Sequence, residues 1–391
     1  MSGFAKNTTF LMFDGSIKKV QDIIIGDFVM GEDSKPRCVL AIDKGFGDMY
    51  DIIPIKGEKY TTTSDVTICL KQTNLGITFC KRYQTFIASF INPITIKKNG
   101  RSFKTKEEAE IYKDSIPESN KFINVKVINY LNIAKNTRDN LKLYRTGVEF
   151  PSQPVRWNSQ IIGMWLGDGW KDKPFITTQD SRIYLYLAKE CAKMNMYLDY
   201  RGNYGYKLSE LTKNTPNRFR QILIDYNVFN NKHVPICYKV NDIDIRRKVL
   251  AGLIDTDGYY IHNCYEIIQK LKVISDDILF IARSLGFAAY QKPCNKSCVY
   301  KGVKFTGLYY RVFISGEGLE HLPVLLLRKQ AHKRQQIKDA LVTGLKILPA
   351  VQAIWYGFTL DGDKRCLLGD FYIFSYFLRV IYITRKKYEK I

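Results

Sequence analysis

Histidine is scarce in this sequence, with four residues among 391, and the nine cysteines are scattered without a CxxC pair. The nearest two cysteines, Cys294 and Cys298, have no second pair and no His cluster beside them. These absences exclude a zinc-finger type of metal centre, which needs four Cys or His ligands at regular spacing. Scattered cysteines of this kind are typical of free thiols in a reducing compartment.

Long hydrophobic runs are also missing. The run near one end, Phe371–Ile383, is interrupted by Arg379 and is too short to cross a bilayer. Residues Met1–Thr9 are mostly polar or small and do not form a signal peptide. We therefore expect no membrane partner.

Acidic residues are few compared with basic ones. The chain has 38 Asp and Glu against 60 Lys and Arg, a net charge of +22 that is spread along its length. Hydrophobic residues make up 46% and charged residues 25%, which is the balance of a globular protein. A basic globular protein favours a polyanionic partner, most simply nucleic acid.

The patterning changes along the chain. Residues 8–71 predict an all-β unit of short strands separated by turn signals such as Gly45-Phe46-Gly47, and residues 106–115 predict a helix. From about Trp157 the pattern becomes α+β. There it predicts helices at 158–167, 182–195, 244–256 and 275–285, and strands at 175–178, 265–269 and 309–315.

An internal repeat lies within the α+β part. Ile161–Gly169 aligns without a gap on Leu250–Gly258, and Gly163, Asp168 and Gly169 match Gly252, Asp257 and Gly258. The remaining positions are mostly apolar in both copies. The repeat predicts two equivalent units that form one pseudo-twofold domain.

The repeated residues suggest a chemistry. Glycines on the apolar faces of two helices allow close packing, which would bring Asp168 and Asp257 together at the helix ends. Two adjacent carboxylates repel each other unless they share a divalent cation, and Mg²⁺ suits phosphodiester hydrolysis. An Asp-Gly pair at a helix end is often only a turn, but its recurrence in both copies favours function. Asp255 is matched by Leu166, so we interpret Asp255 as structural or as a helper.

Leu250–Gly258 (LAGLIDTDG) resembles the signature of the LAGLIDADG homing endonucleases, and Gly163–Gly169 resembles its divergent first copy in monomeric members. The resemblance implies that Asp168 and Asp257 bind metal, with backbone carbonyls of Gly167 and Thr256 able to assist. It further implies Mg²⁺ as cofactor, with Mn²⁺ as a substitute, and two saddle-like sheets that read a long duplex site.

The same resemblance implies a basic residue near each active position. Lys232, in Lys232-His233-Val234-Pro235, matches the first. It would polarise the water or the scissile phosphate, although an ordinary exposed lysine is the alternative. For the second we favour Lys333 over Lys329, and spacing does not separate them.

The flanks resemble an intein. Phe4–Thr8, Asp14–Lys18 and Gly26–Gly31 follow the opening blocks of the Hint fold, and Tyr356–Leu360 and Leu367–Phe371 follow its C-terminal block. The chain is similar to the group that contains the yeast vacuolar-ATPase intein and the mating-type switching endonuclease. With Met1 just before the first block, it resembles a free-standing descendant of that group and a mobile genetic element.

Splicing residues are missing from these blocks. Gly3 stands where a nucleophile is needed, Val66 stands for the assisting His, and the terminal His-Asn pair falls at about Ser375 and Tyr376. Self-cleavage without its nucleophile and base is not expected.

The resulting prediction is an α+β endonuclease domain of two αββαββα-like repeats (157–242 and 243–342) inserted into an all-β Hint horseshoe. The predicted domains are 1–150 with a basic insertion at about 80–145, 151–342, 343–375, and a basic tail at 376–391. We expect a monomeric, site-specific double-stranded DNA endonuclease, nuclear at least transiently and otherwise cytoplasmic. The alternative is a DNA- or RNA-binding intein remnant that no longer cuts.

Six basic residues of the insertion are candidate DNA contacts, although a solvated lysine-rich face is an equally good explanation for any single one. They are Lys81, Arg82, Lys97, Lys98, Arg101 and Lys104.

Overall fold

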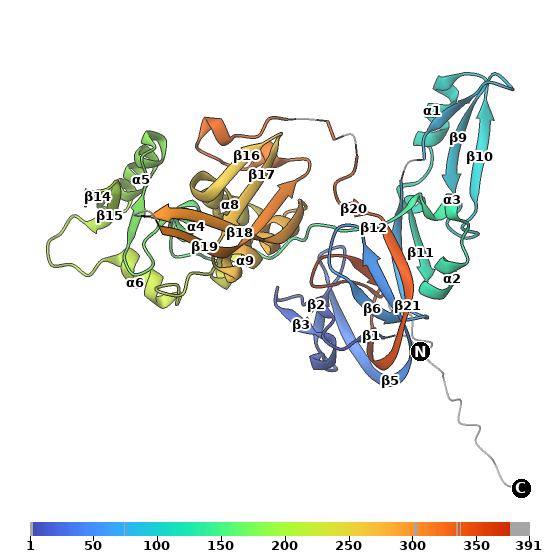
Figure 1. Ribbon diagram of the computed structural model, residues 1–391, viewed down its shortest axis with the longest axis horizontal. Helices are drawn as coiled ribbons and strands as arrows, with labels where there is room; N and C mark the ends of the chain where they lie inside the picture. Colours follow the sequence, from blue (N-terminus) through green and yellow to red (C-terminus); the bar gives the residue numbers. More distant parts are fainter. Residues whose placement is uncertain (1–2, 74, 301–302, 334, 337, 376–391) are drawn as a thin grey trace, which may run out of the picture. The chain divides into compact units, whose positions relative to one another are not determined.

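The computed structural model describes residues 3–73, 75–300, 303–333, 335–336 and 338–375. They form two units (Figure 1): one contains residues up to Tyr144 together with those from Thr343, and the other spans Arg145–Val342. The first unit is thus made from both ends of the chain, and the second is inserted in sequence between them. Tyr376 and the predicted tail lie outside the described residues.

The first unit is mainly antiparallel β-structure. One sheet has the order β21-β1-β6-β5-β4, and another runs β12-β7-β23-β22 with β11 also paired to β7. Strand β1 pairs Phe4 with Tyr356 of β21, so the two ends of the chain share a sheet. The strands are β1 (Phe4–Ala5), β2 (Thr9–Leu11), β3 (Ile17–Lys19), β4 (Phe28–Met30), β5 (Pro36–Pro54), β6 (Tyr60–Thr63), β7 (Thr67–Gln72), β11 (Phe122–Lys126), β12 (Leu141–Tyr144), β21 (Leu345–Leu360), β22 (Arg365–Leu367) and β23 (Ile373–Ser375).

Strand β5 corrects one sequence-based prediction. The glycines of Gly45-Phe46-Gly47 do not form a turn; they lie inside a 19-residue strand that pairs with β21. A Cβ at Gly45 would lie 2.5 Å from Cζ2 of Trp355. The glycine therefore marks a place where an indole packs on the backbone, and glycine in a strand often has this meaning.

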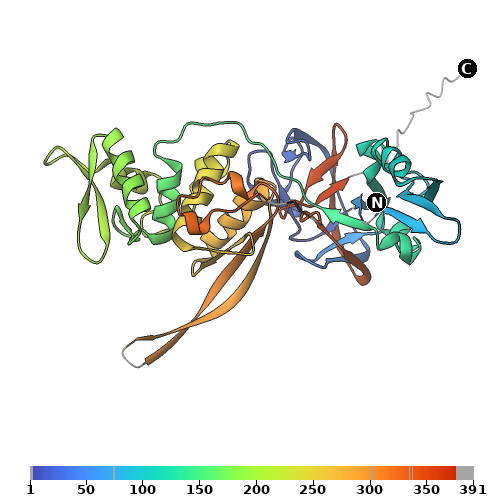
Figure 2. The same cartoon turned by 90° about the horizontal axis from the view of Figure 1, so that it is seen from above.

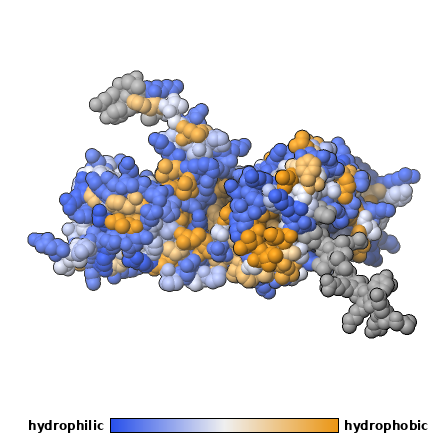
Figure 3. Space-filling model, turned by 90° about the horizontal axis from the view of Figure 1, so that it is seen from below, coloured by the Kyte–Doolittle hydropathy of each residue, from blue (hydrophilic) through white to orange (hydrophobic). Residues whose placement is uncertain are grey.

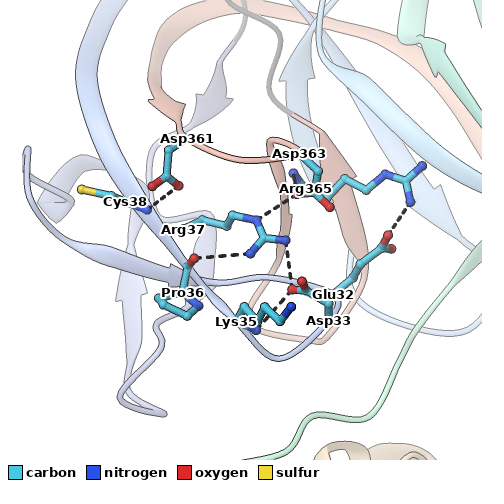
Figure 4. A network of polar contacts seen from close by, with 9 residues as sticks. All are labelled: Glu32, Asp33, Lys35, Pro36, Arg37, Cys38, Asp361, Asp363 and Arg365. Atoms are coloured by element: carbon cyan, nitrogen blue, oxygen red, sulfur yellow. Dashed lines mark hydrogen bonds and ion pairs between the residues drawn. The ribbon is translucent and has the colours of Figure 1, made fainter.

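A polar network joins residues near the two ends of the first unit (Figure 4). The guanidinium of Arg37 donates to Asp33 Oδ1 at 2.9 Å and to Asp363 Oδ1 at 2.8 Å. Beside it, Arg365 pairs with Glu32. The Arg37–Asp363 and Arg365–Glu32 bonds connect chain segments more than 300 residues apart, and Arg37 is only 7% exposed, so its charge-assisted bonds are partly shielded from water.

A small three-stranded sheet and one helix extend the first unit. The strands β8 (Ile77–Cys80), β9 (Thr85–Ile91) and β10 (Lys98–Phe103) form a sheet in the order β10-β9-β8. Helix α1 (Lys106–Asp114) begins with a capping box in which Thr105 and Glu108 exchange side-chain bonds with each other's backbone amides. This confirms the helix predicted at 106–115. Short helices α2 (Val127–Leu131) and α3 (Lys135–Arg138) follow.

The second unit contains the predicted helices. Asn158 caps the start of α4, and Asp242 caps the start of α8, each by accepting backbone amides with its side chain. The two helices lie side by side in the middle of the unit (Figure 1). The helices are α4 (Ser159–Asp168), α5 (Ser181–Lys193), α6 (Arg218–Asp225), α7 (Ile236–Lys239), α8 (Ile243–Asp257) and α9 (Lys272–Ser284).

Each repeat contributes one antiparallel sheet. The first has the order β13-β15-β14 and the second β16-β17-β19-β18, whose long β18–β19 hairpin stands out in Figure 2. The strands are β13 (Phe175–Thr177), β14 (Met196–Tyr200), β15 (Gly205–Glu210), β16 (Gly258–Ile261), β17 (Cys264–Gln269), β18 (Ala288–Tyr300) and β19 (Val303–Ser315).

The repeats differ from the predicted αββαββα pattern in two places. In the first repeat a single bridge, Gly169 to Ile176, stands where the second has strand β16, and Pro174 nearby has no amide proton for a ladder. The second repeat closes with 3₁₀ turns, Leu319–His321 and Leu327–Lys329, in place of a final helix.

The face shown in Figure 3 is mostly hydrophilic, with hydrophobic residues gathered in several patches. Within the described ranges, no helix has both the length and the apolar character needed to cross a membrane.

Candidate active site

The contact between α4 and α8 is made possible by glycine. A Cβ added at Gly163 would lie 2.2 Å from the carbonyl oxygen of Val249, and one added at Gly252 would lie 2.2 Å from that of Gln160. Both distances are far below van der Waals contact, so only glycine fits. The helices therefore approach backbone to backbone, as the repeat predicted.

Asp168 and Asp257 are the last residues of these two helices. The glycines that follow, Gly169 and Gly258, have extended backbones with φ of −76° and −75°, not the left-handed conformation common at helix ends. A Cβ at either position would lie within 2.6 Å of a carbonyl of the preceding turn, Trp165 O or Ile254 O. Lack of space, rather than a special φ, requires glycine here.

Lys232 lies at the end of α4. Its Nζ donates to the carbonyl oxygens of Leu166 (3.0 Å), Gly167 (3.3 Å) and Gly169 (2.7 Å). These carbonyls carry the partial negative charge of the helix C-terminus, which attracts a cation. The lysine is therefore held beside Asp168.

Lys329 has the equivalent place at the end of α8. Its Nζ donates to the carbonyl oxygens of Ile254 (2.8 Å), Asp255 (2.8 Å) and Thr256 (3.1 Å). Lys333, the residue favoured from the sequence, is exposed on the segment beyond, whereas Lys329 repeats the geometry of Lys232.

Two further side chains shape the second half of the site. Gln269 on β17, which the sequence pattern did not reveal, donates from Nε2 to Asp257 Oδ2 at 2.6 Å. Asp255 is buried and accepts the backbone amides of Leu325 and Leu326 at 2.9 and 3.1 Å. Asp255 therefore holds the segment that carries Lys329, which agrees with a structural role.

The two aspartates disfavour each other's charge. Partial burial, which removes water from the carboxylate, and the negative charge of Asp257 raise the pKa of Asp168 to about 6. The positive charges of Lys329 and Lys232 lower it but do not outweigh these effects. Asp168 nevertheless keeps an exposed surface, and solvent weakens these effects. Burial also raises the pKa of Asp257, although the bond from Gln269 counteracts it. Burial lowers the pKa of Lys232 to about 8.

A stability prediction follows from the raised pKa of Asp168. The folded state binds this proton more tightly than the unfolded chain, so the cost of ionising Asp168 grows as pH rises from 3.8 towards and beyond 6. Without divalent metal, Asp168→Asn should raise the free energy of unfolding at pH 8, by at most about 1 kcal/mol because solvent screens the charges. The midpoint should therefore rise at pH 8 and stay unchanged at pH 3.5. Thermal unfolding in chelator at both pH values tests this. An equal gain at pH 3.5 would contradict it.

Few protein ligands are available for a metal here. Among the described residues, no group of three or more His, Cys, Asp or Glu side chains is placed to hold an ion. Two carboxylates that raise each other's cost of ionisation still fit a cation, particularly Mg²⁺, which keeps several waters and binds through one or two carboxylates plus phosphate oxygens. The carbonyls of Gly167 and Thr256 face Lys232 and Lys329.

Family models match one segment in each of the two units. A model described as Hom_end-associated Hint matches residues 3–80, and a model described as homing endonuclease matches residues 233–338. The first matched segment lies in the first unit and the second lies in the second unit. The second match covers Lys329 and Asp257, whereas Asp168 lies outside it and is identified by the repeat.

Individual relatives of this chain are distant in sequence. It is 22% identical to the homothallic switching endonuclease of Saccharomyces cerevisiae, covering 94% of this chain and 78% of the relative. It is 36% identical over 62 residues to the catalytic subunit of the V-type proton ATPase of Candida tropicalis, covering 16% of this chain but only 6% of the relative.

Solved structures give weaker similarities. The gp41-1 intein matches at 21% identity and a TM-score of 0.16, covering 19% of this chain and 56% of the intein. The homing endonuclease I-DmoI in complex with DNA and Ca matches at 14% identity and a TM-score of 0.26, covering 40% of this chain and 82% of I-DmoI.

The Hint part of the chain has no space for a side chain at position 3. A Cβ on Gly3 would lie 2.4 Å from Cε3 of Trp355 and 2.9 Å from the carbonyl oxygen of Tyr356. Val66, at the position of the assisting His, is buried at 2% exposure. Ser375 is also buried, and its hydroxyl has no hydrogen-bond partner among the described residues.

The six basic residues predicted to contact DNA are all exposed, in or beside the small sheet β10-β9-β8. Helix α1 covers one face of that sheet, since Tyr112 packs against Phe90 and Phe103. Arg101 lies on this covered face, with its guanidinium 5.0 Å from the ring of Tyr112. Lys98 pairs with Ile91 and belongs to the opposite face.

Proposed function

We propose that this chain is a site-specific double-stranded DNA endonuclease that hydrolyses one phosphodiester bond in each strand with divalent metal, most simply Mg²⁺. The observation that carries the proposal is the paired arrangement at the ends of α4 and α8. Each helix ends in an aspartate, and a lysine bonds the carbonyls of its last turn. Two such centres suit a duplex, which has two antiparallel strands to cut.

Asp168 and Asp257 would hold the metal, with the carbonyls of Gly167 and Thr256 as further candidate ligands. When bound, the metal would activate water and stabilise charge on the phosphate. Lys232 and Lys329 bring positive charge to the same place, where it would stabilise the developing negative charge. Gln269 holds one oxygen of Asp257, leaving its other oxygen for the metal.

The sheet of the second repeat offers a surface for the duplex. Val312 and Ile314 of β19 are buried, so their neighbours Arg311 and Phe313 face the other way. Lys292 pairs with Arg311 across the strands and shares this face. Glu266 lies on the same face and forms an ion pair with Arg311 at 3.3 Å. A sheet face with such polar side chains fits phosphate contact and major-groove reading.

The first unit adds a second candidate DNA surface. Lys81, Arg82, Lys97, Lys98, Arg101 and Lys104 would contact phosphates beside the cut site and add affinity that falls steeply with salt. Two repeats within one chain supply both half-sites, which favours a monomer on a long site. Action on DNA favours a nuclear location, at least transiently.

The test is cleavage of a randomised duplex library with Mg²⁺ by the wild-type protein, Asp168→Asn and Asp257→Asn. We expect cleavage by the wild type and a loss of at least about 100-fold in each variant, because each aspartate would hold the metal. Sequence-specific binding without cleavage would refute the enzyme and favour the second candidate, a DNA- or RNA-binding remnant.

We also infer that the Hint domain does not splice, since Gly3 offers no nucleophile. Mass spectrometry of the purified chain with added flanking sequences should show the intact, unspliced mass.

A further inference from the structure

The segment that carries Lys232 has little regular structure. It lies between α6, which ends at Asp225, and the short helix α7, which begins at Ile236. Nonetheless Lys232 Nζ reaches three carbonyls at the end of α4. A long flexible side chain keeps such a position only if its backbone is fixed.

Hydrogen bonds on both sides of Lys232 hold this backbone. Asn230 N donates to Lys171 O of the first repeat at 2.7 Å, and beyond Lys232 the partner is a residue of the second repeat. Asp277 on α9 accepts the amide of Val234 on Oδ2 at 2.8 Å and the ammonium of Lys239 on Oδ1 at 2.8 Å. Its two oxygens therefore bond both ends of residues 234–239, a stretch that begins two residues after Lys232. Asp277 is 5% exposed and Val234 1% exposed, so little water competes for the amide.

The segment that carries Lys329 is held differently. Its main carboxylate partner, Asp255, comes from α8, the same helix whose last carbonyls Lys329 contacts. Gln160 on α4 adds one bond to Pro323 O at 2.7 Å. Arg328, next to Lys329, also donates to Asp180 Oδ2 of the first repeat at 2.5 Å. The backbone amides of the Lys329 segment are thus accepted by a carboxylate of its own repeat, whereas the Val234 amide is accepted by a carboxylate of the other repeat.

We propose that Asp277 is a positioning residue for Lys232, so that helix α9 of the second repeat sets the geometry of the active position in the first. The proposal rests on the proposed endonuclease function for its catalytic consequence, but its structural content stands on the Val234 and Lys239 contacts alone. Loss of Asp277 should free the Lys232 segment and leave Lys329 in place.

Chemical labelling tests the structural content without any cleavage. The full-length wild type, Asp277→Ala and Asp277→Asn are treated briefly with an amine-acylating reagent, and each lysine is quantified by mass spectrometry. Asp277→Ala should raise the labelling rate of Lys232 by about fivefold or more, because a half-buried amine reacts when its segment opens locally, and should leave Lys329 unchanged. Asp277→Asn should largely restore protection, since an amide oxygen can still accept the Val234 amide.

A matched control comes from the next residue on α9. Asp276→Ala removes the same charge from the same helix, but Asp276 bonds Lys272 and Gln291 rather than the Lys232 segment. It should leave Lys232 protected. Equal increases at Lys232 and Lys329 in Asp277→Ala, or no increase at either, would overturn the proposal.

Cleavage provides the functional arm. On a duplex selected by the wild type and labelled separately on each strand, Asp277→Ala should slow one strand by roughly tenfold relative to the other, because misplacing a catalytic group costs rate locally. Nicked product should accumulate. If both strands slow equally the positioning role is wrong, whereas an inactive wild type refutes the endonuclease and leaves the labelling result to decide the role of Asp277.

Discussion

Replacing Gly252 by alanine is expected to destabilise the second unit by about 3 kcal/mol, at the upper end for an overfilled core. The new Cβ would lie 2.2 Å from Gln160 O and 2.7 Å from Met164 N. Both atoms are backbone, so neither can rotate away, and the two helices would have to separate. The higher helix propensity of alanine, about 1 kcal/mol, recovers only part of this cost.

Urea unfolding followed by tryptophan fluorescence measures the effect, because Trp157, Trp165 and Trp170 lie in the second unit and only Trp355 lies in the first. Gly307→Ala is the matched control, since its Cβ would meet only a tyrosine side chain at 3.3 Å. Equal midpoints for Gly252→Ala and Gly307→Ala would show that α4 and α8 do not touch as described.

Replacing Lys329 by methionine should lower the rate of DNA cleavage by roughly 100-fold, the usual cost of removing one group that stabilises transition-state charge. Methionine keeps the length and apolar stem of the side chain but removes the ammonium that bonds three carbonyls at the end of α8. Single-turnover cleavage of a selected duplex, with the unfolding midpoint recorded alongside, separates lost chemistry from lost folding.

Lys333→Met is the discriminating control. Lys333 is four residues away, exposed, and carries the same charge. We expect its rate to stay within about twofold of the wild type, as for a surface charge without a specific partner. A larger loss in Lys333→Met than in Lys329→Met would restore the sequence-based choice.

The contact between α4 and α8 could be predicted from the sequence because it depends on local periodicity. Gly163 and Gly252 lie on helix faces whose spacing is fixed by 3.6 residues per turn, so Asp168 and Asp257 follow from the repeat. The predicted helices and strands of the second unit were confirmed for the same reason.

The contact of Lys329 with the end of α8 could not be predicted from helix periodicity. Residues 316–330 form turns, not a regular element, and their path depends on distant groups such as Asp255 and Gln160. Gln269 was missed because its contact with Asp257 arises from strand pairing, which places it beside a helix end twelve residues earlier. The same limit applies to Gly45, where a glycine that packs under Trp355 was interpreted as a turn.

Trp355 limits which residues two positions of the first unit can accept. Its indole rests on two positions without side chains, Gly3 and Gly45. A cysteine or serine at position 3 would overlap the ring, because its Cβ would lie 2.4 Å from Cε3 of Trp355. A side chain at position 3 requires a smaller residue at position 355 as well. Replacing Trp355 alone would leave a void above Gly3 and Gly45. Positions 3, 45 and 355 are therefore coupled, and a larger residue at position 3 is expected to be tolerated only together with a smaller one at position 355.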